Sequence, residues 1–148
     1  MGLVKIYLDM CCYNRPYDDQ SQLKISMETQ SKLHIQMLVR SGRFKLVTSY
    51  MLRYECGNNP FEMRRSAIFD FINKNTYAYI GIERQAMIEA KAEEIMKTGI
   101  KYKDACHVAS AIYAGCEYFI STDSRLLKYK SSEIKMVTPI EFVMETEE

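Results

Sequence analysis

Residues 6–16, IYLDMCCYNRP, open with an apolar run that stops at a single acidic residue, Asp9. A short apolar run followed by polar and turn-forming residues is typical of a buried strand in a parallel sheet. We therefore expect a strand over residues 4–8 and a loop over residues 11–19. Two chemistries compete for this stretch, because either the two adjacent cysteine thiols or the carboxylate of Asp9 could carry a reaction.

The segments outside this stretch alternate between strand-like and helix-like patterns. Strands are expected over residues 44–48, 77–80, 117–121 and 134–137. Helices are expected over residues 20–40, 83–97, 103–114 and 124–129. Three more helices begin at capping signals, which are Ser49, Asn59-Pro60-Phe61-Glu62 and Thr138-Pro139-Ile140-Glu141. Because strands that alternate with helices at these lengths form parallel sheets, we predict one domain over residues 1–148, an α/β three-layer sandwich with a mostly parallel central sheet.

The composition excludes several classes of protein. The chain has 148 residues, of which 47% are hydrophobic, and this is enough for one domain with its own core. Its net charge of +1 gives no general attraction to nucleic acid, so a polyanion would have to be held locally. We find no apolar run of the length of a membrane span and no secretory signal, and the five cysteines have no CxxC spacing. We therefore expect a cytoplasmic protein without a disulfide framework.

Four acidic residues stand where strands and helices meet in this pattern: Asp9, Glu55, Asp104 and Asp123. In parallel sheets, ligands bind at the carboxyl ends of the strands. For any one of these acids alone, a helix cap, a turn or a solvated surface position is the commoner role. Four carboxylates that meet repel one another unless a divalent cation lies among them, and oxygen ligands suit Mg²⁺ or Mn²⁺ better than zinc. The set of four therefore favours a magnesium or manganese site.

Three segments together resemble the PIN domain family of metal-dependent nucleases: residues 6–16, SYMLRYE at 49–55 and KDACHVASAIYAGCEYFISTDSRLL at 103–127. The resemblance spans nearly the whole chain and implies a Rossmann-like sheet with an acidic pocket for one or two Mg²⁺ or Mn²⁺ ions. Position by position, the acidic quartet of the family matches Asp9, Glu55, Asp104 and Asp123. The sequence departs from the family at Met10, where Ser or Thr is frequent, and at Arg125, where a further acid sometimes stands.

The chemistry of phosphodiester hydrolysis assigns a role to each acid. The reaction needs an activated water and neutralisation of charge in the transition state, and a metal held by carboxylates supplies both. We assign Asp9 and Asp123 as direct ligands, and Asp104 as a ligand or as a group that orients water. Glu55 either supports the other ligands or binds a second ion. We therefore expect a metal-dependent endoribonuclease that cleaves single-stranded RNA or structured loops, with DNA as a weaker alternative.

Candidates for contact with the substrate are Asn14, Arg15, Lys103 and Arg125. Arg15 follows the first strand and either binds phosphate or pairs with one of the two acids at residues 18–19, and the sequence favours neither. Residues 11–16 match only a subset of PIN domains, which implies that Asn14 lies close to the metal site. The KYK triplet at 101–103 offers a ring for stacking on bases and lysines for the backbone, although lysines at helix ends are more often simply solvated.

The thiols have weaker support than the acids. None of the five cysteines is followed by an arginine six residues later, as cysteine phosphatases require, and Cys11 stands where a haloacid-dehalogenase-type enzyme needs its second aspartate. A thiol activated by His34 or His107 remains an alternative, but free cysteines are usually small buried hydrophobic residues. His107 lies one helical turn from Asp104, so it either orients that acid or belongs to the core.

The resemblance also implies protein partners. Many bacterial and archaeal PIN domains are toxins of toxin–antitoxin pairs, so we expect a homodimer and a small antitoxin whose C-terminal segment blocks the acidic pocket. A second class of function is a PIN-like interaction module with weak or absent catalysis, which Met10 and Arg125 favour.

Overall fold

The computed structural model describes residues 3–147, and there five strands form one sheet in which every pair is parallel. The strand order is β3-β2-β1-β4-β5. The strands are β1 (Lys5–Leu8), β2 (Lys45–Ser49), β3 (Thr76–Ile80), β4 (Tyr118–Ile120) and β5 (Lys135–Val137). The chain starts at the centre of the sheet, proceeds to one edge, and returns to the other side of β1. The strand order therefore reverses between β1 and β4, which is where such sheets bind ligands.

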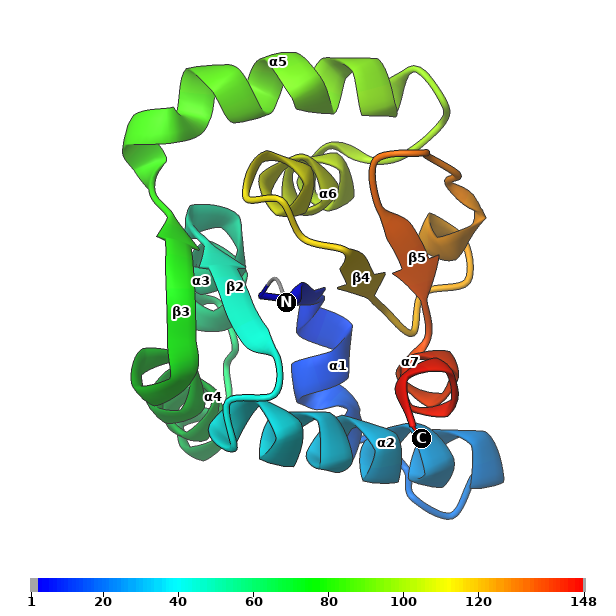
Figure 1. Cartoon of the computed structure of the whole chain (residues 1–148). Helices are drawn as coiled ribbons and strands as arrows, with labels where there is room; N and C mark the ends of the chain where they lie inside the picture. The colour runs from blue at the N-terminus through cyan, green and yellow to red at the C-terminus, as the bar shows by residue number, and fades with distance from the viewer. Residues whose placement is uncertain (1–2, 148) are drawn as a thin grey trace.

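The helices form two layers that cover the sheet (Figure 1). Helices α5 and α6 lie on one side, and α1, α2 and α7 lie on the other. The α-helices are α1 (Met10–Asn14), α2 (Leu23–Arg40), α3 (Tyr50–Gly57), α4 (Glu62–Asn75), α5 (Gln85–Met96), α6 (Tyr102–Tyr113) and α7 (Pro139–Thr146). Short 3-10 turns are η1 (Arg15–Tyr17), η2 (Ile82–Arg84) and η3 (Leu126–Lys128). The expected three-layer α/β sandwich is confirmed, and its sheet is fully parallel.

The central strand β1 is buried from Ile6 to Leu8 because both faces of the sheet are covered there. Ile6 and Leu8 belong to the core between the sheet and helices α1, α2 and α7, whereas Tyr7 belongs to the core on the α5 and α6 side. This division follows from the alternation of side chains along a strand. All three side chains are fully buried. The hydroxyl of Tyr7 therefore lies inside an apolar layer, and its hydrogen bonds are part of the site described below.

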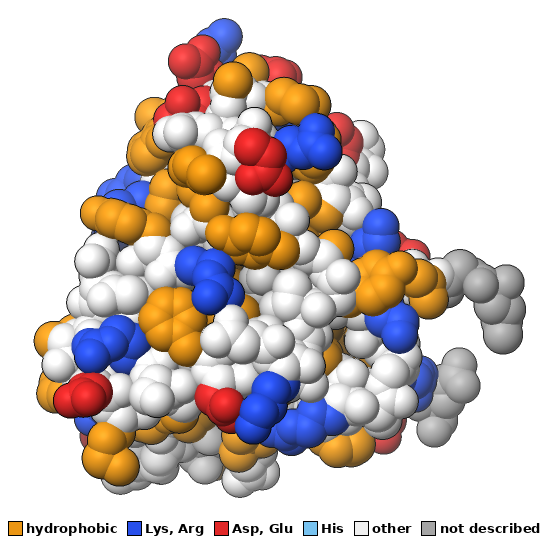
Figure 2. Space-filling view, turned by 90° about the vertical axis from the view of Figure 1, so that its left-hand side faces the viewer, with side chains coloured by type: hydrophobic (Ala, Val, Ile, Leu, Met, Phe, Trp, Pro, Cys, Tyr) orange, Lys and Arg blue, Asp and Glu red, His pale blue; other side chains and the backbone are white. Residues whose placement is uncertain are grey.

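The edge strand β3 carries exposed tyrosines with cations packed on them. Figure 2 shows hydrophobic and basic side chains interleaved on the side of the molecule where β3 lies. The Lys45 ammonium lies 5.6 Å from the ring centre of Tyr77, and the Arg53 guanidinium lies 5.8 Å from that of Tyr79. Lys45 belongs to β2 and Arg53 to α3, so cations from neighbouring elements lie over the edge strand, where charge disfavours pairing with other chains.

The segment after β1 differs from the expected loop, because α1 begins directly at Met10 and η1 follows it. The carboxylate of Asp9 accepts a hydrogen bond from the backbone N–H of Met10, and Cys12 and Tyr13 are buried against the core. Helix α1 ends at Asn14, and the turn η1 continues with Arg15 and Pro16, so regular structure extends through these turn-forming residues. Tertiary burial of the first helical turn thus outweighed the turn-forming residues that the sequence displays.

Of the three predicted capping signals, two are confirmed and one is wrong. Ser49 caps α3, because its side chain accepts the N–H of Leu52. Thr138 and Glu141 form the expected capping box at the start of α7. The prediction that Asn59 caps α4 with Pro60 at its first position was wrong, since α4 begins at Glu62. The side chain of Asn59 instead accepts a hydrogen bond from the N–H of Phe61, which stabilises a turn before the helix.

All five cysteines are free, so the expectation of no disulfide framework is confirmed. Among residues 3–147, no helix has the length and apolar character required to cross a membrane.

The packing of α7 against the sheet can be tested by substitution of Phe142. Phe142 is fully buried, and its ring contacts Phe44 and Tyr118 edge to face at centroid distances of 4.9 and 5.0 Å. Phe142→Ala should lower the free energy of unfolding by about 3–5 kcal/mol, as measured by urea denaturation. Met144→Ala, on the same helix but 74% exposed, should change it by less than about 0.5 kcal/mol. Equal effects of the two substitutions would contradict this packing.

Candidate metal centre

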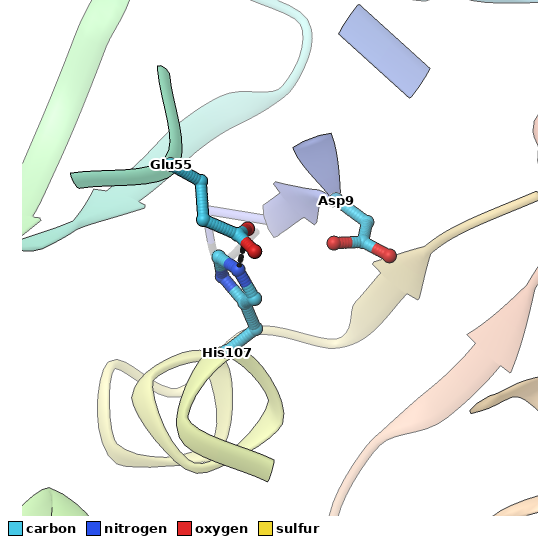
Figure 3. A group of neighbouring side chains, drawn as sticks. All are labelled: Asp9, Glu55 and His107. Atoms are coloured by element: carbon cyan, nitrogen blue, oxygen red, sulfur yellow. Dashed lines mark hydrogen bonds and ion pairs between the residues drawn. The ribbon is translucent and has the colours of Figure 1, made fainter. Parts of the chain in front are cut away.

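The candidate metal centre lies at the carboxyl ends of β1 and β4, where the strand order reverses. Asp9 follows β1, Glu55 comes from α3 and His107 comes from α6, and each offers a ligand atom within 4.8 Å of the others. The three side chains point toward a common space (Figure 3). Segments that are far apart in the sequence therefore meet at the edge of the sheet where the sequence analysis placed a site.

The carboxylate of Asp9 is held rigidly, because both of its oxygens accept hydrogen bonds. Oδ1 accepts from the N–H of Met10 at 2.9 Å. Oδ2 accepts from the hydroxyl of Ser121 at 2.9 Å and from the thiol of Cys11 at 3.4 Å. Ser121 stands directly after β4, so this contact links the ends of the two strands. Asp9 is only 5% exposed, and the orientation of its carboxylate is therefore fixed by the protein itself.

A chain of hydrogen bonds orients Glu55 from inside the core. Oε1 of Glu55 lies 2.5 Å from Nε2 of His107, and Nδ1 of His107 lies 2.6 Å from the hydroxyl of Tyr7. The Tyr7 hydroxyl lies 2.6 Å from Oγ of Ser49, which also accepts the N–H of Leu52 at the start of α3. Nε2 donates to the carboxylate whether or not His107 carries a charge, so Glu55 is held in both states.

Opposing effects determine the protonation of these buried groups. Burial lowers the pKa of His107, but the hydrogen bond to Glu55 and the charges of Asp9, Glu55 and Asp104 outweigh it, so the pKa is raised overall. Burial raises the pKa of Tyr7 well above its usual value, and Tyr7 therefore stays a neutral hydroxyl. A neutral hydroxyl is able both to donate and to accept, as its position in the chain requires.

Asp104 feels the charge of every other predicted acid. Burial, the largest cause, and the charges of Asp9, Asp123 and Glu55 together raise its pKa to about 6, while His107 acts in the opposite direction. Asp104 is half-buried and lies outside the group of three with ligand atoms within 4.8 Å. The four acids thus share one electrostatic environment, and of the four, Asp9 and Glu55 belong to the close group with His107.

Asp123 has a structural task at the end of β4. Its Oδ1 accepts the N–H of Arg125 at 2.9 Å and that of Leu126 at 3.4 Å, which starts the turn η3. The N–H of Asp123 in turn donates to Ser121 Oγ, the same hydroxyl that donates to Asp9. Asp123 therefore belongs to the hydrogen-bond network of the site, but it is not part of the close group around Asp9.

The donor set fits a hard divalent cation held by carboxylates. Two atoms bound to one octahedral ion at about 2.1 Å lie roughly 3 Å apart. Nε2 of His107 and Oε1 of Glu55 are closer than that, at 2.5 Å, so in this arrangement His107 supports Glu55 and does not share an ion with it. The remaining donors are carboxylate oxygens, which suit Mg²⁺ or Mn²⁺. A cation among them would relieve the repulsion that, together with burial, raises the pKa of Asp104.

The predicted substrate-binding residues are placed at different points around this centre. Arg15 is paired, since its guanidinium lies 2.9 Å from Asp18 and 3.2 Å from the buried Glu28. Asn14 lines a cleft that also contains Glu55. Lys103 packs over the ring of Tyr54 at 5.3 Å, and Arg125 is exposed after Asp123.

Sequence reasoning missed the partners that orient the acids. It allowed His107 to orient Asp104, whereas the ring nitrogen contacts Glu55. It did not single out Tyr7 or Ser121, although a tyrosine in an otherwise aliphatic strand and a hydroxyl two residues before an acid were visible signals. A buried Tyr hydroxyl needs a partner, and this requirement was the clue available.

No protein-family model and no curated protein matches the sequence. Solved structures match its fold. A chain of FitAB bound to IR36 DNA fragment gives a TM-score of 0.60 at 14% identity, covering 91% of this chain and 95% of that one. A chain of FitAcB from Neisseria gonorrhoeae gives 0.54 at 13%, covering 90% and 97%. A chain of VapBC2 from Rickettsia felis bound to a DNA fragment from their promoter gives 0.56 at 10%, covering 90% and 97%. At these identities the likeness concerns the fold, and the expected PIN-like fold is confirmed.

Removal of one hydroxyl tests the buried chain. Tyr7→Phe leaves Nδ1 of His107 without its partner, so we expect the free energy of unfolding to fall by about 1–3 kcal/mol in urea denaturation. Tyr79→Phe removes a hydroxyl from a tyrosine that is 48% exposed and should have almost no effect. A Tyr7→Phe protein as stable as the wild type would show that this chain of hydrogen bonds makes no net contribution to the free energy of unfolding.

The repulsion at Asp104 predicts an unusual pH dependence. The pKa of this acid is about 6 in the folded protein against 3.8 ordinarily, so the folded state binds more protons between these values and loses stability as pH rises through them. In EDTA, Asp104→Asn should therefore be more stable than the wild type above pH 6, and the difference should vanish toward pH 4. Urea denaturation across this range measures it. Asp70→Asn, an exposed acid paired with Lys74, should show no such trend; a pH-independent difference for Asp104→Asn would refute the prediction.

Proposed function

We propose that this chain, which has the PIN-like fold, is a divalent-metal-dependent endoribonuclease and the toxin of a toxin–antitoxin pair. The observation that carries the proposal is the convergence of Asp9 and Glu55 at the reversal point of the sheet, with Asp104 in their electrostatic field. Within residues 3–147, no arginine or lysine pairs with Asp9, Glu55 or Asp104, and only His107 contacts Glu55, so a divalent cation is the counter-charge that fits these carboxylates best. RNA hydrolysis is the activity that the resemblance to the PIN domain family implies for such a site.

In the proposed enzyme, Asp9 and Asp123 would hold the metal ion, and Asp104 beside them would act as a further ligand or orient water. When bound, Mg²⁺ or Mn²⁺ lowers the pKa of a water ligand and neutralises charge on the phosphate. Glu55 faces the same space, and His107 fixes its orientation through a hydrogen bond of 2.5 Å. Asp9 is fixed by Met10 and Ser121, so both carboxylates are preorganised and lose little entropy when they bind the ion.

Asp104 suits a second task as well. A carboxylate whose pKa is about 6 is partly protonated just below neutral pH and accepts a proton readily above it. In the proposed mechanism, Asp104 either ligates the ion or orients the attacking water.

The proposed partners follow from the same resemblance. They are RNA as the substrate, single-stranded or in structured loops, a small antitoxin, and a second copy of this chain. The fold shared with chains of the VapBC2 and FitAB structures supports the toxin assignment. A cytoplasmic location is the corresponding expectation for a nuclease that acts on cellular RNA.

The nuclease activity is tested by cleavage of a single-stranded RNA in the presence of Mn²⁺ or Mg²⁺. The wild type should cleave the RNA, EDTA should stop the reaction, and Asp9→Asn should lower the rate by more than about 100-fold, the upper range for the loss of an outer partner of a metal ligand. Asp70→Asn, an exposed acid on α4, should keep the wild-type rate.

Two results would count against the enzyme. Equal rates for the wild type and Asp9→Asn would identify a contaminating nuclease, and absence of cleavage with several metals and substrates would favour the interaction module. Met10 and Arg125 are the residues that favour this second function, because they stand where the family often has a hydroxyl and sometimes a further acid. Mn²⁺ binding, measured by calorimetry on the wild type and on Asp9→Asn, separates an inactive module that lacks metal from an enzyme that lacks its substrate.

A further inference from the structure

We propose that the cleft beside Glu55 is a nucleotide subsite that binds one base of single-stranded RNA by stacking and contacts its phosphate through Arg64. The inference rests on the proposed nuclease function and adds the part of the substrate that this chain recognises. The cleft has a volume of about 310 Å³ and is formed by α1, η1, the end of α3 and the start of α4. Its size falls in the range of pockets that enclose small ligands.

The cleft and the metal centre adjoin each other. Glu55 belongs to both, and Met10, which also lines the cleft, directly follows Asp9. A strand whose phosphodiester lies at the metal centre therefore places a neighbouring nucleotide at the cleft. A separate surface pocket would have no such continuity with the reacting bond.

Arg64 gives the cleft a cation that is free to meet a phosphate. Within residues 3–147, no carboxylate lies within 4.0 Å of its guanidinium. Asp18 also lines the cleft, but its carboxylate is paired with Arg15 at 2.9 Å. An arginine presents a planar fork of donors that matches phosphate oxygens. Arg64 is therefore the side chain of the cleft that can pair with a phosphate.

Aromatic rings provide the stacking surface. The Arg64 guanidinium lies 4.1 Å from the ring centre of Phe61 and 5.1 Å from that of Tyr17. Phe61 is 55% exposed and Tyr17 is 39% exposed. Rings and guanidinium groups that are open to solvent are the platforms on which proteins stack unpaired bases.

Amide side chains provide donors and acceptors for a base edge. Asn14, Asn58 and Asn59 line the same cleft. Asn59 is fixed, because its Oδ1 accepts the N–H of Phe61, and its Nδ2 lies 3.5 Å from Oδ1 of Asn14. Asparagine pairs with base edges through its amide, so these residues are placed to discriminate between bases. A duplex presents no free base to such a cleft, which makes single-stranded RNA the fitting ligand.

The test measures RNA binding separately from cleavage. Binding of a fluorescent single-stranded RNA octamer in EDTA, followed by anisotropy, should be about tenfold weaker for Phe61→Ala and for Arg64→Ala than for the wild type. For Arg64→Ala, the slope of log K against log salt should also fall by about 0.7, the value for one lost phosphate contact on a single strand. Phe61→Tyr keeps the ring and should restore binding.

Matched controls come from the same chain. Met63→Ala removes a side chain on α4 that is 87% exposed and lies outside this cleft. Arg84→Ala removes an arginine that packs over a tyrosine ring, Tyr113, at 5.6 Å, again outside the cleft. Both should bind RNA as the wild type does, and far-ultraviolet circular dichroism confirms that all variants are folded.

Hydrolysis of bis(p-nitrophenyl) phosphate with Mn²⁺ separates the two proposals, because this small diester has no base. The control variants Met63→Ala and Arg84→Ala should hydrolyse it at the wild-type rate, whereas Asp9→Asn should not. If the wild type fails to hydrolyse either this diester or RNA, the nuclease proposal fails, while the binding data still judge the cleft. The subsite is overturned if both cleft variants bind RNA like the controls, if the wild type does not bind the octamer, or if it binds duplex RNA equally well.

Discussion

The hydrogen bond between Tyr7 and His107 connects the centre of the sheet to the helix layer behind it, and the candidate site depends on it. Tyr7 stands on the central strand, where neither face reaches water, so its hydroxyl must find a partner inside the core. Helix α6 supplies His107 and the end of β2 supplies Ser49, and the imidazole passes this fixed geometry on to Glu55. One polar atom in an apolar strand thereby sets the position of α6 against the sheet and the orientation of a carboxylate at its edge. An apolar residue in its place would pack as well but would orient nothing.

The opposite constraint acts at the surface of the same edge, where carboxylates are brought together at a cost. The pKa of Asp104 is about 6 because burial and the charges of its neighbours disfavour its ionised form. Hydrogen bonds to Asp9 from Met10 and Ser121 offset part of this repulsion, as does the contact between His107 and Glu55. The remainder is the electrostatic energy that a divalent cation would recover on binding. A metal-binding site is expected to hold its carboxylates rigidly, as Asp9 and Glu55 are held here, and to keep them repelling one another until a cation binds.

Much of the fold could be predicted from local patterns, since each buried strand of a parallel sheet is a short apolar run and the helices between them have clear ends. The strand at residues 4–8 and the capping box at Thr138 were correct for this reason. The helix at Met10–Asn14 was missed because its stability comes from burial of Cys12 and Tyr13 and from the Asp9 cap, and none of these is a local propensity. The start of α4 was placed two residues early because the turn that holds Asn59 imitates a helix cap.

The sequence by itself determined the α/β class, the parallel sheet and the placement of Asp9 and Glu55 at the carboxyl edge of the sheet, because these depend on periodicity along the chain. Only the tertiary structure decided which groups touch. It assigned His107 to Glu55 rather than to Asp104, and it brought the hydroxyl of Ser121 to Asp9. It also assembled the cleft around Arg64 from two separate segments, residues 10–18 and 55–64. Contacts between residues 50 or 100 positions apart depend on how layers pack against one another, and periodicity along the chain does not encode that distance.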